Sequence, residues 1–253
     1  MLAVARRNKI KEYIDFSKYV TVTELAAEFN VTKETIRRDL QLLESQNVLT
    51  RSYGGAYVVE GVENDVNVNL REHIHVEGKR KIANRCAEFI QNGDSVFLDA
   101  STTSLYIAEN LKSKSLTVIT NSAKILATLS GVDGIKFILI GGNFDRNSMS
   151  FLGPAAARNM QQYHFDQSVI SCRSIDLCNG IMDSNEQQAE IRGIAIEHAN
   201  KTILVADYTK FDRTAFCTIA PLDRVDMLVV DAALRDEWKT YLAEHRITPV
   251  ECV

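Results

Sequence analysis

The stretch TKETIRRDL, residues 32–40, decides the fold of the N-terminal region. Taken as a helix, it places Ile36 and Leu40 on one apolar face. Lys33 and Arg38 then lie on the solvent side, close to the N-terminal end of that helix. Basic side chains at this end are typical of a helix that enters the major groove of DNA. We therefore interpret residues 32–40 as part of a recognition helix.

The residues before this stretch complete a helix-turn-helix pattern. Apolar periodicity predicts a first helix over residues 4–14. The sequence TVTE at residues 21–24 matches a capping box, in which threonine caps a helix and glutamate reaches back to the cap. This second helix is expected to end near Phe29. Thr32 is an N-cap candidate for the third helix, which is expected to end near Gln46.

Two short strands are predicted after the third helix, at residues 48–51 and 56–59. They flank YGG at residues 53–55, where glycine permits the positive φ of a tight turn. Three helices and such a hairpin make a winged helix-turn-helix. The segment that follows is polar and acidic, with little periodicity, and is interpreted as a linker. We predict a DNA-binding domain at residues 1–59, a linker at 60–77 and an effector-sensing domain at 78–253.

Charge alone gives weak support for DNA binding. The chain has a net charge of −4, while its first 60 residues carry nine Lys/Arg and eight Asp/Glu. The alternative to a recognition helix is an ordinary solvated helix on which Arg37 and Arg38 pair with Glu34 or Asp39. The capped helix before it and the glycine hairpin after it favour the recognition helix.

From residue 79 onward, short apolar runs alternate with amphipathic stretches. The runs are rich in Val and Ile and predict strands at residues 95–99, 116–120, 137–140, 167–171, 202–206 and 227–230. Helical patterns lie between them, at residues 105–111, 123–129 and 186–197 among others. This alternation predicts an α/β domain, with a mostly parallel sheet covered by helices on both faces.

Composition excludes several classes of protein. With 253 residues, 45% of them hydrophobic and 25% charged, the chain is typical of a globular protein with room for two domains. It has no apolar run of about 18 residues, so we expect no membrane association. The N-terminus lacks the apolar core of a secretory signal, which predicts a cytoplasmic protein. The five cysteines include no C-x-x-C pair, so we expect neither a metal site nor a cofactor.

Three segments of the N-terminal region resemble the head of the DeoR family of bacterial regulators. They are VTELA at 22–26, VTKETIRRDL at 31–40 and LTRSYGGA at 49–56. Asn47 stands where that family often has glycine, and asparagine tolerates the same left-handed backbone. The resemblance implies a double-stranded DNA operator as partner. The predicted DNA contacts are Thr23, Thr32, Lys33, Thr35, Arg37, Arg38, Arg51 and Tyr53.

Polar residues follow four of the predicted strands. They are DASTT at 99–103, TNS at 120–122, GGN at 141–143, and Asp207 with Lys210. Ligands of α/β sheets bind at the carboxyl ends of the strands, and hydroxyl groups beside a helix N-terminus can hold an anion. Each signal alone is also typical of a helix cap or a turn. Together they predict a polar ligand site.

The same segments resemble the effector domain of the DeoR family, as do Asp176 with Gly180 and the sequence DYTKF at 207–211. That domain is similar in fold to ribose-5-phosphate isomerase and CoA transferases, so the resemblance implies a phosphorylated sugar as effector. Ser101 stands where glycine is frequent, and Gln188 and Arg192 stand where glutamate and lysine are common. The predicted effector-binding residues are Asp99, Ser101, Thr102, Thr103, Asn121, Gly141, Gly142, Asp176, Arg192, Asp207 and Lys210.

Roles can be assigned within this set. We predict that Ser101, Thr102 and Thr103 hold the phosphate and that Lys210 adds positive charge. Asp99 would repel a phosphate, so it is expected to hydrogen-bond the sugar, together with Asn121.

The predicted function is sequence-specific DNA binding that a phosphorylated sugar modulates, and the resemblance favours a repressor of a sugar-metabolism operon. Because one head buries little surface on DNA, we expect a homo-oligomer, either a dimer or a tetramer. We predict no enzymatic activity. One alternative is a sugar-phosphate isomerase-like enzyme fused to a DNA-binding head, with Asp99, Asp176 and Lys210 as base and electrophile. Another is an architectural DNA-binding protein without a ligand.

Overall fold

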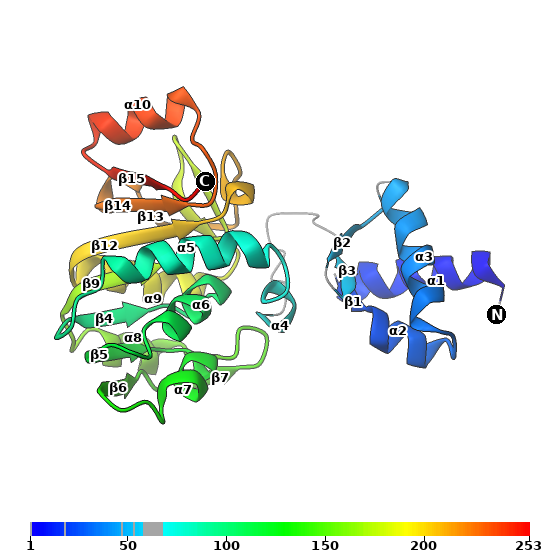
Figure 1. The fold of residues 1–253 in the computed structure, drawn as a ribbon, viewed down its shortest axis with the longest axis horizontal. Helices are drawn as coiled ribbons and strands as arrows, with labels where there is room; N and C mark the ends of the chain where they lie inside the picture. The colour runs from blue at the N-terminus through cyan, green and yellow to red at the C-terminus, as the bar shows by residue number, and fades with distance from the viewer. Residues whose placement is uncertain (1, 18, 47, 53, 58–67) are drawn as a thin grey trace. The chain divides into compact units, whose positions relative to one another are not determined.

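A computed structural model describes residues 2–17, 19–46, 48–52, 54–57 and 68–253. The chain divides into two compact units, Met1–Ile74 and His75–Val253 (Figure 1). Within the segment predicted as a linker, residues 68–71 are helical and a second helix begins at Val76. Val58 and Val59 of the second predicted strand lie outside the described residues.

The first unit forms a helix-turn-helix with a small antiparallel sheet. Its helices are α1 (Ala3–Ser17), α2 (Val22–Glu28), α3 (Lys33–Ser45) and the short α4 (Val68–Arg71). The sheet order is β1-β3-β2, with β1 at Tyr19–Thr21, β2 at Thr50–Ser52 and β3 at Gly55–Tyr57. The predicted hairpin is therefore present as β2 and β3. The sequence did not indicate β1, which has only three residues.

Apolar packing inside this unit follows the predicted helical stripes. Ile10 and Ile14 of α1 are fully buried against Ile36, Leu40 and Leu43 of α3 in one core cluster. The capping box is present as predicted, because the Thr21 hydroxyl accepts from the backbone N–H of Glu24 and the Glu24 carboxylate accepts from that of Thr21. The apolar stripe of α3 faces the core, which leaves its polar face on the surface.

Among the described residues of the second unit, seven parallel strands form the main sheet. The strand order is β15-β14-β12-β9-β4-β5-β6. The bounds are β4 Ser95–Leu98, β5 Leu116–Thr120, β6 Ile135–Leu139, β9 Phe165–Ile170, β12 Ala199–Ala206, β14 Met227–Val230 and β15 Thr248–Glu251. The six predicted strands are all present. The seventh, β15, contains Pro249 and lies at the edge, where proline costs no ladder hydrogen bond.

Helices cover both faces of this sheet, as the alternation of the sequence predicts. One face packs against α5 (Val76–Glu88), α6 (Thr102–Asn110) and α7 (Ala123–Leu129), and the other against α8 (Pro154–Met160), α9 (Glu186–Glu197) and α10 (Asp236–Glu244) (Figure 1). Successive strand residues alternate between the two cores: Val96 and Leu98 face the first, and Phe97 faces the second.

Shorter elements follow the carboxyl ends of several strands of the main sheet. A hairpin pairs β7 (Asn143–Asp145) with β8 (Ser150–Leu152). A second antiparallel sheet has the order β10-β11-β13, with bounds Ser174–Asp176, Gly180–Asp183 and Cys217–Ala220. Two 3₁₀ turns are η1 (Tyr208–Lys210) and η2 (Leu222–Arg224). The sequence did not indicate these small strands, which are three or four residues long.

Candidate functional site

Two groups of polar residues are candidates for function, one on α3 and one along the carboxyl edge of the main sheet. On α3, Thr32 caps the helix by accepting a hydrogen bond from the Thr35 N–H at 3.2 Å. The side chain of Arg38 is 79% exposed and that of Arg37 is 60% exposed. Lys33 is exposed as well. The structure therefore presents a basic surface on the first turns of α3.

Glu34 lies between the two arginines of this surface. Its carboxylate is 3.5 Å from Nη1 of Arg37 and 3.5 Å from Nε of Arg38. Such exposed pairs within a helix contribute about 0.3–0.5 kcal/mol, so a phosphate or a base edge can compete for the guanidinium groups. The pairing of Arg37 and Arg38 with Glu34, expected for an ordinary solvated helix, is therefore present. This pairing is compatible with DNA binding.

Asp39 is not a partner of Arg37 or Arg38. It is buried, and its carboxylate accepts from Nε of Arg6 at 2.6 Å and from Nη1 of Arg7 at 3.4 Å. This contact fixes α3 against α1. It also explains why an acidic residue follows two exposed arginines without reducing the basic character of the surface.

The wing is fastened to α3 through Arg51. Both the backbone N–H and Nε of Arg51 donate to the Glu44 carboxylate, at 2.9 and 2.6 Å. The backbone hydrogen bond, followed by the side-chain one, lowers the pKa of Glu44 below its ordinary value. Because Arg51 has further N–H groups, it can hold the wing and still reach a phosphate.

The remaining predicted DNA contacts are found in different surroundings. Thr23 is exposed on α2, Thr35 is half-buried, and Tyr53 lies outside the described residues. Gln41 is exposed one turn after Arg37 and was not among the predictions.

The second group follows the order of strands along the carboxyl edge of the main sheet. From β14 to β6, the first polar or glycine residues after the strands are Asp231, Asp207, Ser171, Asp99, Asn121 and Gly141. Neighbouring strands lie about 4.8 Å apart, so β12 and β4 are separated by roughly 10 Å and β12 and β6 by roughly 19 Å. Lys210 and the Asp99–Thr103 loop therefore lie within reach of one small ligand, whereas Gly141 and Gly142 lie at the far end.

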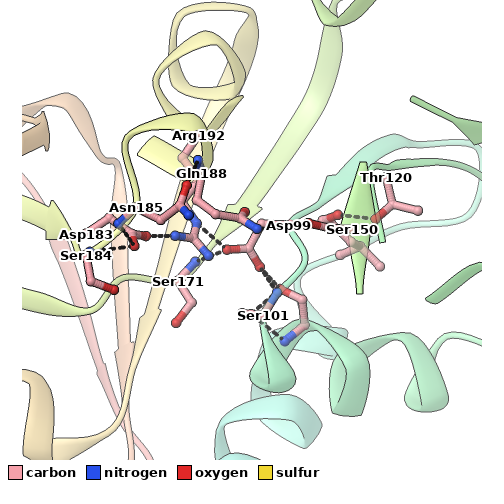
Figure 2. A network of polar contacts seen from close by, with 12 residues as sticks. Asp99, Ser101, Thr120, Ser150, Ser171, Asp183, Ser184, Asn185, Gln188 and Arg192 are labelled. Atoms are coloured by element: carbon pink, nitrogen blue, oxygen red, sulfur yellow. Dashed lines mark hydrogen bonds and ion pairs between the residues drawn. The ribbon is translucent and has the colours of Figure 1, made fainter. Parts of the chain in front are cut away.

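Asp99 is the centre of a buried polar network (Figure 2). Its Oδ1 accepts from the Ser101 N–H at 3.1 Å and from the Ser104 hydroxyl at 2.5 Å. Its Oδ2 accepts from the Ser171 N–H at 2.9 Å and from Nε of Arg192 at 2.7 Å. A carboxylate has about four acceptor sites, and all four are occupied here. This arrangement orders the loops after β4 and β9.

Arg192 lies between two carboxylates, as Figure 2 shows: Nε donates to Asp99 and Nη1 to Asp183. Burial raises the pKa of Asp99, but the positive charge of Arg192 and the hydrogen bonds from Ser101, Ser104 and Ser171 hold it below the ordinary value. Arg192 thus balances buried negative charge. Nearby on α9, the Gln188 amide donates to the Ser150 hydroxyl at 2.9 Å, which joins α9 to β8.

The loop after β4 carries the predicted phosphate contacts. Ser101 caps α6, since its hydroxyl accepts from the Ser104 N–H at 3.0 Å. Within the part of the chain that the structure describes, no side-chain partner is found for the hydroxyls of Thr102 and Thr103. Both residues belong to the first turn of α6, where free N–H groups and the helix dipole favour an anion.

Asn121 follows β5 and is completely buried. Its Nδ2 donates to the Phe151 carbonyl at 3.2 Å, while its Oδ1 has no partner among the described residues. A buried acceptor without a partner is unfavourable, and a ligand hydroxyl could satisfy it. A Cβ on Gly142 would lie 2.6 Å from the Leu152 carbonyl, so close packing accounts for that glycine.

Asp207 and Lys210 frame the loop after β12. The Asp207 carboxylate accepts from the Thr209 N–H at 3.0 Å, and Nζ of Lys210 lies 3.9 Å from it. Asp176 lies elsewhere, on β10, and accepts from the N–H groups of Cys178 and Asn179 in the following turn. These bonds, with that of Asn179 first, lower the pKa of Asp176.

The loop after β9, residues 171–173, was missing from the predicted site. Because β9 lies between β12 and β4, this loop occupies the middle of the edge. Cys172 within it is 7% exposed, and burial raises the pKa of its thiol to about 12. Lys210, Arg192, Asp207 and Asp99 all act electrostatically on that thiol, which places Cys172 among the polar groups of the site.

Two known protein families match this chain. Residues 6–62 match the family described as "DeoR-like helix-turn-helix domain". Residues 74–232 match the family described as "DeoR C terminal sensor domain". The chain belongs to the DeoR family. It is a DNA-binding transcriptional regulator of the helix-turn-helix type, and its second unit is a DeoR sensor domain. The family resemblance of the sequence is thereby confirmed.

Relatives of this DeoR-family chain are regulators rather than enzymes. The "Uncharacterized HTH-type transcriptional regulator YulB" of Bacillus subtilis is 41% identical over 92% of this chain and 91% of its own. The "Putative aga operon transcriptional repressor" of Escherichia coli O157:H7 is 32% identical over 90% of this chain and 86% of its own. The "L-fucose operon activator" of Haemophilus influenzae is 31% identical over 97% and 98%.

Among solved structures, this chain is similar to ribose 5-phosphate isomerase A from Methanocaldococcus jannaschii. The two are 12% identical over 53% of each chain, with a TM-score of 0.39. The described helices of this chain include none with the length and hydropathy to cross a membrane.

Proposed function

We propose that this DeoR-family regulator represses genes of sugar metabolism and that a phosphorylated sugar bound at the carboxyl edge of the β12-β9-β4-β5 strands modulates its DNA binding. The relative named as an aga operon repressor supports repression. Because another relative is named as an L-fucose operon activator, the experiment also has to determine whether this chain represses or activates. Recognition of DNA would use the basic surface of α3, with Arg51 of the wing on a phosphate.

The observation that carries the ligand class is the first turn of α6. Thr102 and Thr103 are buried residues of this turn, and no side-chain partner for their hydroxyl groups is found in the described residues. A dianionic phosphate needs several donors, which this turn supplies. Lys210 lies two strands away and adds positive charge.

The sugar would occupy the space between Asn121 and the β9 loop. Asn121 Oδ1 is the buried acceptor that a sugar hydroxyl can satisfy. Asp99 accepts four hydrogen bonds from the protein, so we assign it to ordering Ser101 and Ser171 rather than to direct contact with sugar. The same saturation argues against Asp99 as the base of an isomerase.

Calorimetry with sugar phosphates tests this proposal. A panel of ribose 5-phosphate, glucose 6-phosphate and fructose 6-phosphate is compared with the unphosphorylated sugars. Thr102→Val removes a donor at nearly constant volume, and Lys210→Met removes the charge. Loss of a hydrogen bond to a charged group costs about 1.5–3 kcal/mol, or roughly 10- to 150-fold in affinity.

Matched controls are available in the same unit. Thr128 on α7 donates to the Lys124 carbonyl, and Lys239 pairs with Glu251. Thr128→Val and Lys239→Met should bind the sugar phosphate as the parent does. Parental affinity in Thr102→Val or Lys210→Met would show that the phosphate is held elsewhere, and reporter expression with and without the sugar gives the sign of regulation.

A further inference from the structure

Asp231, which directly follows β14, is packed against the first turn of α5. A Cβ placed on Gly78 of α5 would lie 2.0 Å from Oδ2 of Asp231 and 2.9 Å from its Cγ. No side chain other than hydrogen therefore fits at position 78 unless the carboxylate moves. The close approach brings a negative charge to the positive end of the helix dipole of α5.

The other oxygen of the same carboxylate holds the loop after β12. Oδ1 of Asp231 accepts from the Tyr208 N–H at 2.8 Å. Tyr208 is the first residue of η1, between Asp207 and Lys210. One half-buried carboxylate thus contacts both the proposed effector loop and the first turn of α5.

His75 makes a second contact between the same two segments. It occupies the N-cap position of α5 in a left-handed conformation, with φ 51° and ψ 40°, and gives no side-chain cap. Its ring lies edge-on to the ring of Tyr208, with centroids 5.5 Å apart. A left-handed backbone at a non-glycine residue is held only where the surroundings determine it.

The contacts of Asp231 and His75 lie where the chain enters the sensor unit. His75 is the first residue of the sensor unit, so the chain that comes from the DNA-binding unit enters the sensor at α5. We propose that Asp231 is a positioning residue that couples the effector loop at Tyr208–Lys210 to the entry of the chain at His75–Gly78. This inference rests on the proposed effector site.

Charge supplies the driving force. Lys210 lies 3.9 Å from Asp207, and Asp207 in turn acts on Asp231 as a like charge. When Lys210 turns to a phosphate, Asp207 loses part of its compensation and its repulsion of Asp231 grows. The Asp231 carboxylate then moves away from the Tyr208 N–H, and the first turn of α5 follows. The ligand thereby favours a second arrangement of this turn.

Three variants and one control test the coupling. Asp231→Ala deletes the carboxylate, and Gly78→Ala displaces it while keeping its charge. In the double variant the nearest remaining atom of residue 231 is Cβ, 3.3 Å from the new methyl group, so the steric conflict is largely relieved. The control is Asp226→Ala at the opposite end of β14, where Oδ2 accepts from the Thr202 N–H at 2.7 Å.

The measurement is the ratio of DNA affinity without and with sugar phosphate. The DNA is a duplex selected from a random library by the parent protein, and the probes are ribose 5-phosphate, glucose 6-phosphate and fructose 6-phosphate. Allosteric ratios are typically about 5- to 150-fold. We expect the ratio to fall to about one in Asp231→Ala, in Gly78→Ala and, with no further loss, in the double variant, while the affinities for sugar phosphate and for free DNA stay within about twofold. Asp226→Ala should keep the parental ratio.

The outcomes separate this inference from the proposed function. A parent that binds no sugar phosphate of the panel would overturn both. A parent that responds, together with an Asp231→Ala variant that keeps the parental ratio, would overturn the coupling alone. Equal loss in Asp226→Ala would also overturn it, because a general loss of stability would then explain the result.

Discussion

Arg38 and Arg192 carry the same guanidinium group in opposite surroundings. The side chain of Arg38 is 79% exposed beside Glu34, and that of Arg192 is 6% exposed between Asp99 and Asp183. In water a guanidinium exchanges its partners at little cost, whereas a buried one is costly to leave unpaired. The first arginine is therefore available to DNA, and the second is committed to the structure of the sensor.

Replacing Arg38 tests the exposed case. We expect Arg38→Ala to weaken binding to a selected DNA duplex by about 1–3 kcal/mol at fixed salt, because a base or phosphate contact is lost. The melting temperature should stay unchanged. Arg85→Ala is the matched control, since Arg85 is also an exposed helical arginine paired with a glutamate one turn away. Unaltered gel-shift affinity in Arg38→Ala would show that another face of α3 meets the DNA.

Replacing Asp99 tests the buried case. Asp99→Asn should lower the free energy of unfolding at neutral pH by about 3–5 kcal/mol, because Arg192 loses one of its two carboxylates. Since the pKa of Asp99 is lowered by folding, its contribution is complete above the ordinary value of about 3.9 and is lost as the pH falls through the lower folded value.

The pH dependence separates the two proteins. The difference in stability between parent and Asp99→Asn, measured by denaturant unfolding, should therefore begin to shrink below about pH 4 and disappear once the pH is below the folded pKa of Asp99. Asp133→Asn, at an exposed acid, should follow the parent at every pH. A constant difference between parent and Asp99→Asn down to acid pH would mean that packing, rather than charge, dominates at this position.

Among the elements, α2 shows how a local signal fixes a helix. It has only seven residues, and its start is held by the reciprocal hydrogen bonds of Thr21 and Glu24. Short helices gain little from propagation, so a cap contributes a large share of their stability.

Removing the cap tests that share. We expect Thr21→Ala to destabilise the DNA-binding unit by about 1 kcal/mol. Thr21→Ser keeps a hydroxyl that can cap, and it should unfold with the parent. Thermal unfolding followed by circular dichroism measures both. If the two variants lost equal stability, the methyl group of Thr21 rather than its hydroxyl would be responsible.

Local signals of this kind explain which elements the sequence predicts. The caps at Thr21 and Thr32 and the stripe of α3 depend on residues within one or two turns, so the helices of the head could be predicted closely. Strand order depends on pairing between distant segments. That order places β9 between β12 and β4, so the loop at residues 171–173 could not be assigned to the site from the sequence. The burial of Arg192 between Asp99 and Asp183 could not be predicted either, because it also depends on contacts between distant segments.

At the scale of the whole molecule, the chain combines a DNA-binding unit with a sensor more than twice as long. One helix-turn-helix head contacts few bases, and proteins of this type read paired half-sites about one helical turn of DNA apart, or multiples of that spacing. Binding of a ligand to the sensor can change affinity for paired sites by changing how two heads are presented.

Light scattering tests the expected assembly. We expect at least twice the mass of the chain at the concentrations at which the protein binds DNA. Sedimentation of the protein with a DNA duplex that carries a single half-site provides the control, since the affinity for it should be much lower. A monomer on full-length operator DNA would contradict the prediction.

The groups proposed to contact the effector, Thr102, Thr103, Asn121 and Lys210, lie in the segments that directly follow strands of the main sheet. Phe97, Val118, Val169 and Leu204 of those strands are buried in the two apolar cores. Recognition and folding are therefore encoded by largely separate positions, with Asp99 as an exception because it orders two loops of the site. Mutations in the loops can alter the preferred metabolite while the scaffold keeps its stability. Such modularity makes the domain evolvable: gene duplication followed by loop divergence can yield a sensor for a new nutrient without redesign of the sheet.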